Sequence, residues 1–146
     1  MIRRFTECSQ PLNREEVRQT LEADVFTSLR NCSIIIAGMN HYVNQQQCRI
    51  KIQQFKMYFD TLEKYAQIAA DRVDSLEKAK FLSSADPEMR LIHSSISSLN
   101  QIIEALYQIH PDYTLNSRKY KRKTFDRDEY CRVVLPLCNT FLKFLT

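Results

Sequence analysis

The sequence feature that most restricts the fold is a run of apolar residues between positions 52 and 76, whose spacing alternates between three and four. On an α-helix this spacing collects the residues into one stripe, the a/d seam of nearly four heptads. Polar and charged residues fill most of the other positions, as in a helix with one buried and one solvated face. The seam comprises Ile52, Phe55, Phe59, Leu62, Ala66, Ala69, Val73 and Leu76. We therefore predict a long amphipathic helix here.

Three other segments carry apolar residues at similar helical spacing. The first contains Val17, Leu21, Val25, Leu29, Cys32, Ile36 and Met39; the third contains Met89, Ile92, Ile96, Leu99, Ile103 and Leu106; the last contains Tyr130, Val134, Leu137, Phe141 and Phe144. Together with the long segment they predict four helices, over about residues 13–40, 49–83, 87–109 and 126–145. A chain of 146 residues is the size of one domain, so we predict a single helical-bundle domain over residues 1–146.

The chain contains one glycine, Gly38. Tight hairpins, phosphate-binding loops and sharp strand-to-helix turns need residues that tolerate positive φ, and glycine usually supplies them. Strand patterns are also nearly absent, so the sequence predicts an all-α protein. Short connections favour antiparallel neighbours, and we predict an antiparallel four-helix bundle with an exposed basic loop over residues 111–125 at one end.

Two points in this prediction depend on local breaks in the helical pattern. Residues 44–48 (NQQQC) interrupt the seam without a proline or glycine, and we place a turn between about Met39 and Arg49. The alternative is one helix of about 70 residues, about 100 Å long, which would have to dimerise. Pro136 lies inside the last segment, where a proline removes a backbone hydrogen bond and clashes with the preceding turn. We expect a kink or a restart of the helix there.

The sequence contains no recognisable arrangement of catalytic, metal-binding or cofactor-binding residues. With one glycine, no Walker loop, G-x-G-x-x-G or G-x-S-x-G motif can occur. His41, His93 and His110 lie on separate segments without a cysteine at ligand spacing, so a zinc site is not supported. Paired carboxylates occur where helix N-termini favour negative charge. We therefore predict that the protein is not an enzyme and has no metal or cofactor.

The cysteines and apolar runs indicate the cellular compartment. The cysteines are odd in number and have no C-x-x-C spacing: Cys8, Cys32, Cys48, Cys131 and Cys138. Together with a start that has no apolar signal segment, they favour free thiols in a reducing intracellular compartment, nuclear or cytoplasmic. The longest apolar run is far shorter than the roughly 20 residues that span a bilayer, so we expect no membrane association.

A cluster of cations occupies residues 118–123; its members are Arg118, Lys119, Lys121, Arg122 and Lys123. The formal net charge of the whole chain is +4, so the rest of the chain carries about −1. A solvated loop between helices is one explanation. Short basic clusters are also typical of import signals and of patches that bind acidic proteins or nucleic acid. Because the rest of the chain is nearly neutral, nucleic acid is the less favoured of these partners.

Three consecutive isoleucines, Ile34, Ile35 and Ile36, point in directions about 100° apart on a helix, so one seam cannot bury all of them. Either this helix is central in the bundle, or a second face contacts a partner. We therefore predict a non-catalytic protein–protein interaction module, an adaptor or scaffold subunit of a larger intracellular complex. Its binding residues are Ile34, Ile35 and the five cations, and its partner is a helical or acidic protein, with a homo-oligomer as a further option. The alternative is a nucleic-acid-associated protein that binds through Arg118–Lys123.

Overall fold

The computed structural model describes residues 14–79, 87–109 and 124–145. Six elements follow one another along the chain: α2 (Arg14–Asn44), β1 (Arg49–Lys51), α3 (Ile52–Lys78), α4 (Pro87–Ile109), β2 (Thr124–Asp126) and α5 (Arg127–Phe144). The described residues are predominantly helical and form four helices with one two-stranded sheet. This confirms the predicted all-α class.

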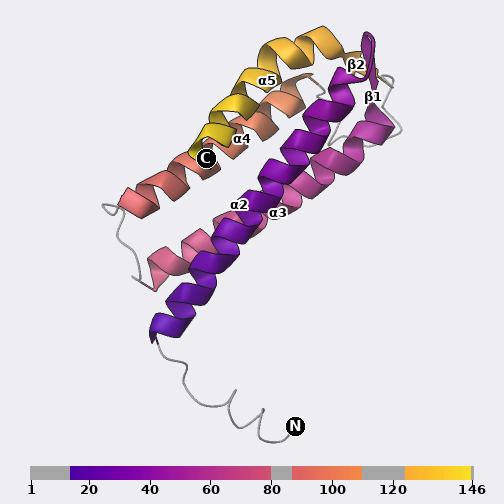
Figure 1. The fold of residues 1–146 in the computed structure, drawn as a ribbon. Helices are drawn as coiled ribbons and strands as arrows, with labels where there is room; N and C mark the ends of the chain where they lie inside the picture. Colours follow the sequence, from indigo (N-terminus) through magenta and orange to yellow (C-terminus); the bar gives the residue numbers. More distant parts are fainter. Residues whose placement is uncertain (1–13, 80–86, 110–123, 146) are drawn as a thin grey trace, which may run out of the picture.

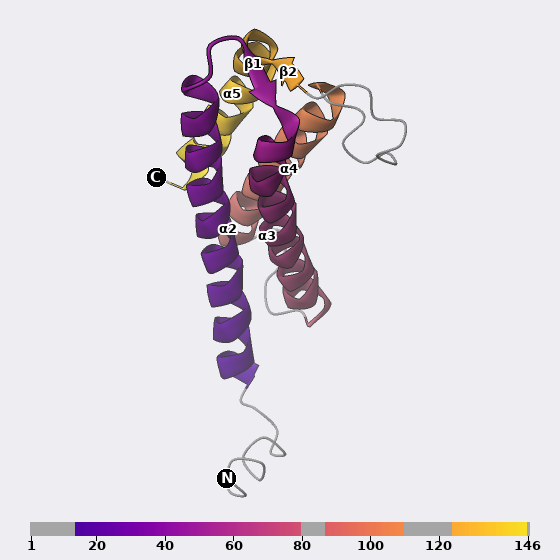
Figure 2. The ribbon, with the colours of Figure 1, turned by 90° about the vertical axis from the view of Figure 1, so that its right-hand side faces the viewer.

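The helices lie side by side in two pairs, α2 with α3 and α4 with α5 (Figures 1 and 2). α3 also contacts α4, and α2 contacts α5, so both pairs share one hydrophobic core. The two short strands lie together at one end of the molecule, beside the start of α3 and the start of α5 (Figure 1). No helix in these ranges combines the length and the apolar character that a membrane span requires.

The seam predicted for α3 is the face that this helix buries. All eight predicted seam residues are buried, and they are the complete set of buried residues on this helix. Charged residues cover its outside, where Nζ of Lys56 lies 3.1 Å from Oδ2 of Asp60. An exposed ion pair of this kind contributes little to stability, so burial of the seam is what holds α3 in place.

The face that α4 buries is wider than predicted. Ile96 and Ile103 of the predicted seam are only half-buried, whereas Ile102 and Ile109 are buried. α4 packs against α3 and also against α5, and a helix with two neighbours buries more than one stripe. The small residues on the additional buried positions are Ser95, Ser98 and Ala105.

Two segments predicted as helix and loop form strands instead. β1 and β2 pair in antiparallel register, with Ile50 opposite Phe125. Both of these side chains are buried, so the pairing carries apolar residues into the core. The helix predicted over 49–83 therefore begins at Ile52, and the loop predicted over 111–125 ends in a strand that begins at Thr124. Most of that loop lies outside the described residues.

α2 and α3 are separate helices, so the alternative of one continuous helix is wrong. α2 extends to Asn44, beyond its predicted end near residue 40, and residues 45–48 lead into β1. The backbone amide of Arg127 donates a 3.0 Å hydrogen bond to the carbonyl of Cys48. The start of α5 thus holds the turn that separates the two helices.

α5 continues across Pro136 without the restart that was one of the two expectations for this residue. At its beginning, Oδ1 of Asp126 accepts a 3.0 Å hydrogen bond from the backbone amide of Asp128. This cap starts the helix at Arg127, one residue after the predicted start. Figure 1 shows α5 following a curved path along α4, and a kink centred on Pro136 stays a prediction.

Candidate functional site

The structure places the three isoleucines of α2 in three different environments. Ile36 is fully buried, Ile35 is half-buried against the core, and Ile34 is 62% exposed. α2 is therefore not a central helix that is covered on all sides. Of the predicted binding pair, Ile34 is accessible to a partner, whereas Ile35 mostly packs against the core.

Other exposed residues extend the surface around Ile34 along one side of α2. We call this surface the α2 outer face; it comprises Ala23, Phe26, Arg30, Ile34, Ala37 and His41, all of them exposed. At 100° per residue, these positions fall within about 80° of one another around the helix and extend over about 27 Å. Apart from Arg30 and His41 the residues are apolar, and Phe26 is 38% exposed. The α2 outer face is therefore an accessible and largely apolar stripe.

Contacts with α3 occupy another side of α2. The rings of Tyr42 and Tyr58 stack with their centroids 5.8 Å apart, and the Tyr42 hydroxyl donates a 2.8 Å hydrogen bond to Oε1 of Gln54. Gly38 lies against the same ring, because a Cβ at this position would be 3.2 Å from Cε1 of Tyr58. The single glycine of the chain thus makes room for a tyrosine ring between two helices.

A buried polar cluster joins α2 to α5. The Tyr130 hydroxyl donates a 2.6 Å hydrogen bond to Oδ1 of Asn40. The thiol of Cys138 lies within hydrogen-bonding reach of both side chains. Burial raises the pKa of Cys138 to about 12 and the pKa of Tyr130 well above its usual range. Both groups stay protonated at neutral pH, so Cys138 acts as a packing residue rather than as a nucleophile.

Histidine and cysteine side chains make structural contacts in the described parts of the chain. Nε2 of His93 on α4 lies 2.5 Å from Oε1 of Glu77 on α3, which links these two helices. Within residues 14–79, 87–109 and 124–145, no three His, Cys, Asp or Glu side chains come close enough together to hold a metal ion. The cysteines of these ranges are free thiols, and Cys32 and Cys138 are buried.

The five predicted cations at 118–123 lie outside the described residues. The structure does describe the residue that follows them: Thr124 opens β2 and pairs with Lys51 of β1. Nε of Arg49 donates a 3.1 Å hydrogen bond to Oγ1 of Thr124, across 75 positions of the sequence. Arg49 and Lys51 are both exposed, so two further cations lie beside the residue that follows the cluster. Local sequence patterns could not show that Arg49 and Lys51 lie beside Thr124, because these residues meet only through the pairing of β1 with β2.

Comparisons with protein-family models, with curated proteins and with solved structures find no match to this chain. The described residues form an all-α fold with an accessible, largely apolar face on α2 and a pair of exposed cations on the small sheet. The α2 outer face is therefore the main candidate site.

Proposed function

We propose that this protein is a non-catalytic protein–protein interaction module, an adaptor or scaffold subunit of a larger intracellular complex in the nucleus or cytoplasm. Its binding site is the α2 outer face. The observation that carries the proposal is that Ile34, which lies in this accessible and largely apolar stripe, is 62% exposed. Complete burial of an isoleucine side chain is favourable by about 1.5–3 kcal/mol, so a partner that covers Ile34 gains binding energy there.

The chemistry of the α2 outer face favours a helical partner with acidic residues beside its own apolar stripe. An amphipathic helix presents apolar side chains at a matching three- and four-residue spacing. The small side chains of Ala23 and Ala37 allow its backbone to approach α2 closely. Arg30 and His41 accompany the apolar residues, and carboxylates on the partner would orient it against them.

The proposed site also requires α2 to lie at the outside of an antiparallel four-helix bundle. As the residue number rises along α2, the number of the contacted residue on α3 falls, as in an antiparallel helix pair. The contacts that support this arrangement are Arg14 to Ala79, Asp24 to Arg72 and Tyr42 to Gln54. In such a bundle an edge helix keeps one face free for a partner.

The test compares the variants Ile34→Lys and Met57→Lys. Met57 is 72% exposed on α3 between polar neighbours, so it matches Ile34 in exposure but lies outside the proposed site. The tagged full-length protein and both variants are purified from the cell type of origin, and their partners are quantified by mass spectrometry. Ile34→Lys should lose a stoichiometric partner that the wild type and Met57→Lys both retain. Identical partner sets for all three proteins would contradict the proposed site.

A homo-oligomer is the case in which a second copy of the chain covers the α2 outer face. Multi-angle light scattering of the purified protein measures its mass directly. If a second copy is the partner, the wild type should be a dimer and Ile34→Lys a monomer, while Met57→Lys stays dimeric. If the wild type is a monomer, the partner that covers the α2 outer face is a different protein.

A second candidate function is nucleic-acid binding through the basic cluster, extended by Arg49 and Lys51. The pairing of Lys51 with Thr124 favours it, because it adds exposed cations beside the residue that follows the cluster. Each neutralised phosphate of duplex DNA adds about 0.9 to the slope of log affinity against log salt concentration. Replacing Arg49 and Lys51 by serine should therefore lower that slope by about 1 to 2. Binding that does not respond to salt would remove this candidate.

A further inference from the structure

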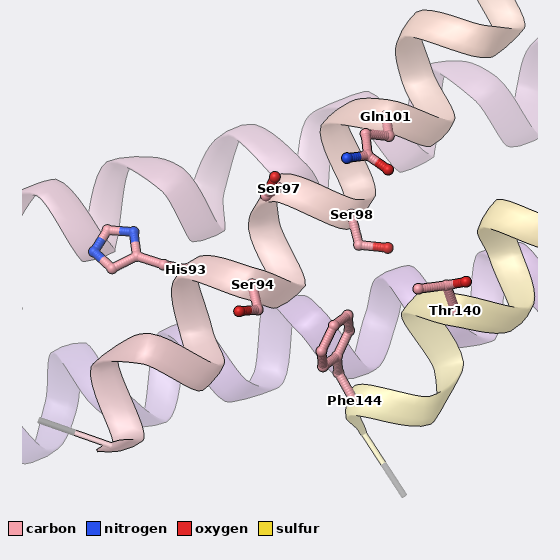
Figure 3. A pocket seen from close by; sticks show the side chains of 7 residues that line it. All are labelled: His93, Ser94, Ser97, Ser98, Gln101, Thr140 and Phe144. Carbon is pink, nitrogen blue, oxygen red and sulfur yellow. The ribbon is translucent and has the colours of Figure 1, made fainter.

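A groove on the surface between α4 and α5 is lined by seven residues, four of which carry hydroxyl groups (Figure 3). Its volume is about 390 Å³, within the roughly 300–1,000 Å³ of ligand pockets. The lining residues are His93, Ser94, Ser97, Ser98 and Gln101 of α4 and Thr140 and Phe144 of α5. None of them belongs to α2, so this groove is separate from the α2 outer face.

Ser98 is the residue that indicates a binding site. It is only 4% exposed, and in the described ranges its Oγ is the one buried side-chain nitrogen or oxygen without a hydrogen-bond partner. Figure 3 shows this oxygen directed into the space between the two helices, toward Thr140. A buried hydroxyl without a partner is unfavourable, so a group that enters the groove and bonds to it is stabilised there.

Two neighbouring hydroxyl groups show the usual way in which such a side chain is satisfied. Ser95 is also buried on α4, and its hydroxyl donates a 2.9 Å hydrogen bond to the carbonyl of Leu91. Thr140 donates a 3.1 Å hydrogen bond to the carbonyl of Pro136 and keeps its lone pairs as acceptors. Ser98 differs from both, because its buried hydroxyl has no hydrogen-bond partner among the described residues.

The lining of the groove favours an uncharged ligand. It contains no Lys, Arg, Asp or Glu side chain. The ring of His93 contacts Glu77 and in Figure 3 is directed away from Ser98. An anion or a metal ion would therefore lose its hydration without meeting an opposite charge. The hydroxyls and the carboxamide of Gln101 each donate and accept hydrogen bonds, and Phe144 adds an apolar wall.

We propose that this groove binds a primary carboxamide, as carried by an Asn or Gln side chain of a peptide. The carbonyl oxygen of the ligand accepts a hydrogen bond from Ser98, and its amino group donates to a lining hydroxyl such as that of Thr140. Its aliphatic stem packs against Phe144. A carboxamide suits the groove better than a polyol, because it can pair reciprocally with Gln101 and because its stem is apolar.

Titration of the isotope-labelled full-length protein with N-acetyl-glutamine amide, followed by protein NMR, tests this proposal. Shifts of backbone amide signals should concentrate at the residues that line the groove. Ser98→Ala should weaken binding by about fivefold or more, the effect of one hydrogen bond. Ser95→Ala is the matched control and should leave the affinity unchanged.

Two further ligands complete this experiment. N-acetyl-glutamate amide has nearly the same shape but a negative charge, and it should bind more weakly than the glutamine compound. Methyl glucoside represents a polyol and should also bind more weakly. Preferential binding of the sugar or of the glutamate compound, or the absence of localised shifts with any of the three, would overturn the carboxamide assignment.

A stability measurement tests the open hydroxyl without any ligand. Replacing serine by alanine raises helix propensity at both positions, so Ser95→Ala corrects Ser98→Ala for this effect. Because the Ser98 hydroxyl has no partner in the free protein, Ser98→Ala should raise the Tm by more than Ser95→Ala does. An equal or smaller rise would show that Ser98 is already hydrogen-bonded, and the basis of the proposal would be lost.

Discussion

The hydroxyl of Tyr130 on α5 donates a 2.6 Å hydrogen bond to Asn40 on α2, across 90 positions of the sequence. The ring of Tyr130 is buried and packs edge-on against Phe55 of α3, with the ring centroids 5.8 Å apart. This side chain of α5 therefore contacts two other helices, α2 and α3. Its ring fills the core, and its directional polar bond favours one register of α5 on α2.

Tyr130→Phe keeps the ring and removes this bond. The side chain of Asn40 then loses a buried partner, so the free energy of unfolding should fall by about 1–3 kcal/mol. Tyr42→Phe is the matched control, because it removes an exposed hydrogen bond to Gln54 and should change stability by less than about 0.5 kcal/mol. Urea denaturation followed by circular dichroism measures both changes. Equal losses of unfolding free energy would show that the buried hydrogen bond contributes no more to stability than the exposed one.

The cysteines should differ strongly in reactivity. Burial raises the pKa of Cys32 and of Cys138 to about 12 each, whereas Cys48 is exposed. Only the thiolate attacks N-ethylmaleimide, so this reagent should modify Cys48 quickly and the two buried thiols slowly at neutral pH. Mass spectrometry of the digested protein gives the rate at each site. In denaturant the three rates should converge, and fast modification of Cys138 in the folded protein would contradict the buried cluster.

The buried face of a helix could be predicted where one stripe suffices. The seam of α3 was predicted residue by residue, because its apolar positions form one stripe with polar residues elsewhere. The same approach failed for α4: Ile96 and Ile103 are half-buried, while Ser95 and Ser98 are buried. The periodicity of apolar residues predicts only the apolar stripe of a helix. It does not predict the burial of a small polar residue, which depends on a second helix that approaches it.

Features that depend on distant parts of the chain could not be predicted. Ile50 forms a strand because it pairs with Phe125, and no local pattern around either residue shows the other. The groove at Ser98 exists because Thr140 lies across from it. For Ile34 the sequence left two alternatives, a central helix or a second face, and the 62% exposure found in the folded chain favours the second. The remaining predicted site residues, 118–123, lie outside the described ranges.

In the substitution Gly38→Ala, helix propensity and packing should change the stability in opposite directions. Replacing a glycine by alanine inside a helix favours folding by about 0.8–1 kcal/mol. The new Cβ would lie 3.2 Å from Cε1 of Tyr58, which is tighter than ordinary contact, so part of this gain should be lost. In a Tyr58→Ala background the full gain should appear. Chemical denaturation of the single and double variants gives the coupling energy, and a coupling of zero would show that the ring does not constrain this position.

Tyr107 should make stability sensitive to high pH. It donates a hydrogen bond to Glu63, and burial together with that carboxylate raises its pKa to about 12. An unfolded tyrosine has a pKa of about 10, so the folded state holds the proton more tightly. The resulting stabilisation is complete below about pH 10 and is lost as the pH rises through about 12.

Tyr107→Phe should remove this dependence. Between about pH 9.5 and 11.5 the free energy of unfolding should fall less steeply for the variant than for the wild type. Urea denaturation at a series of pH values measures both slopes. Other groups, including Tyr130, titrate in both proteins and cancel in the difference. Identical slopes would show that Tyr107 titrates alike in the folded and unfolded chains.

One variant tests whether the basic cluster contributes to binding without contributing to the stability of the fold. In this variant serine replaces all five cations: Arg118, Lys119, Lys121, Arg122 and Lys123. None of these positions belongs to a predicted seam, and surface substitutions usually change stability by less than about 0.5 kcal/mol each. Removal of like charges also relieves repulsion, so the Tm should stay the same or rise slightly. Binding to an acidic protein or to nucleic acid, or nuclear accumulation if the cluster is an import signal, should fall.

The outcome of that variant separates three roles for the cluster. A Tm that falls by several degrees would mean that the cations hold the fold together through acidic residues, contrary to a recognition role. An unchanged Tm with unchanged binding and unchanged localisation would assign the cluster to a solvated loop. An unchanged Tm with lost binding supports recognition, and Arg49→Ser with Lys51→Ser then tells how far the site extends. Because Lys51 pairs with Thr124, that double variant should weaken the same binding and not a different one.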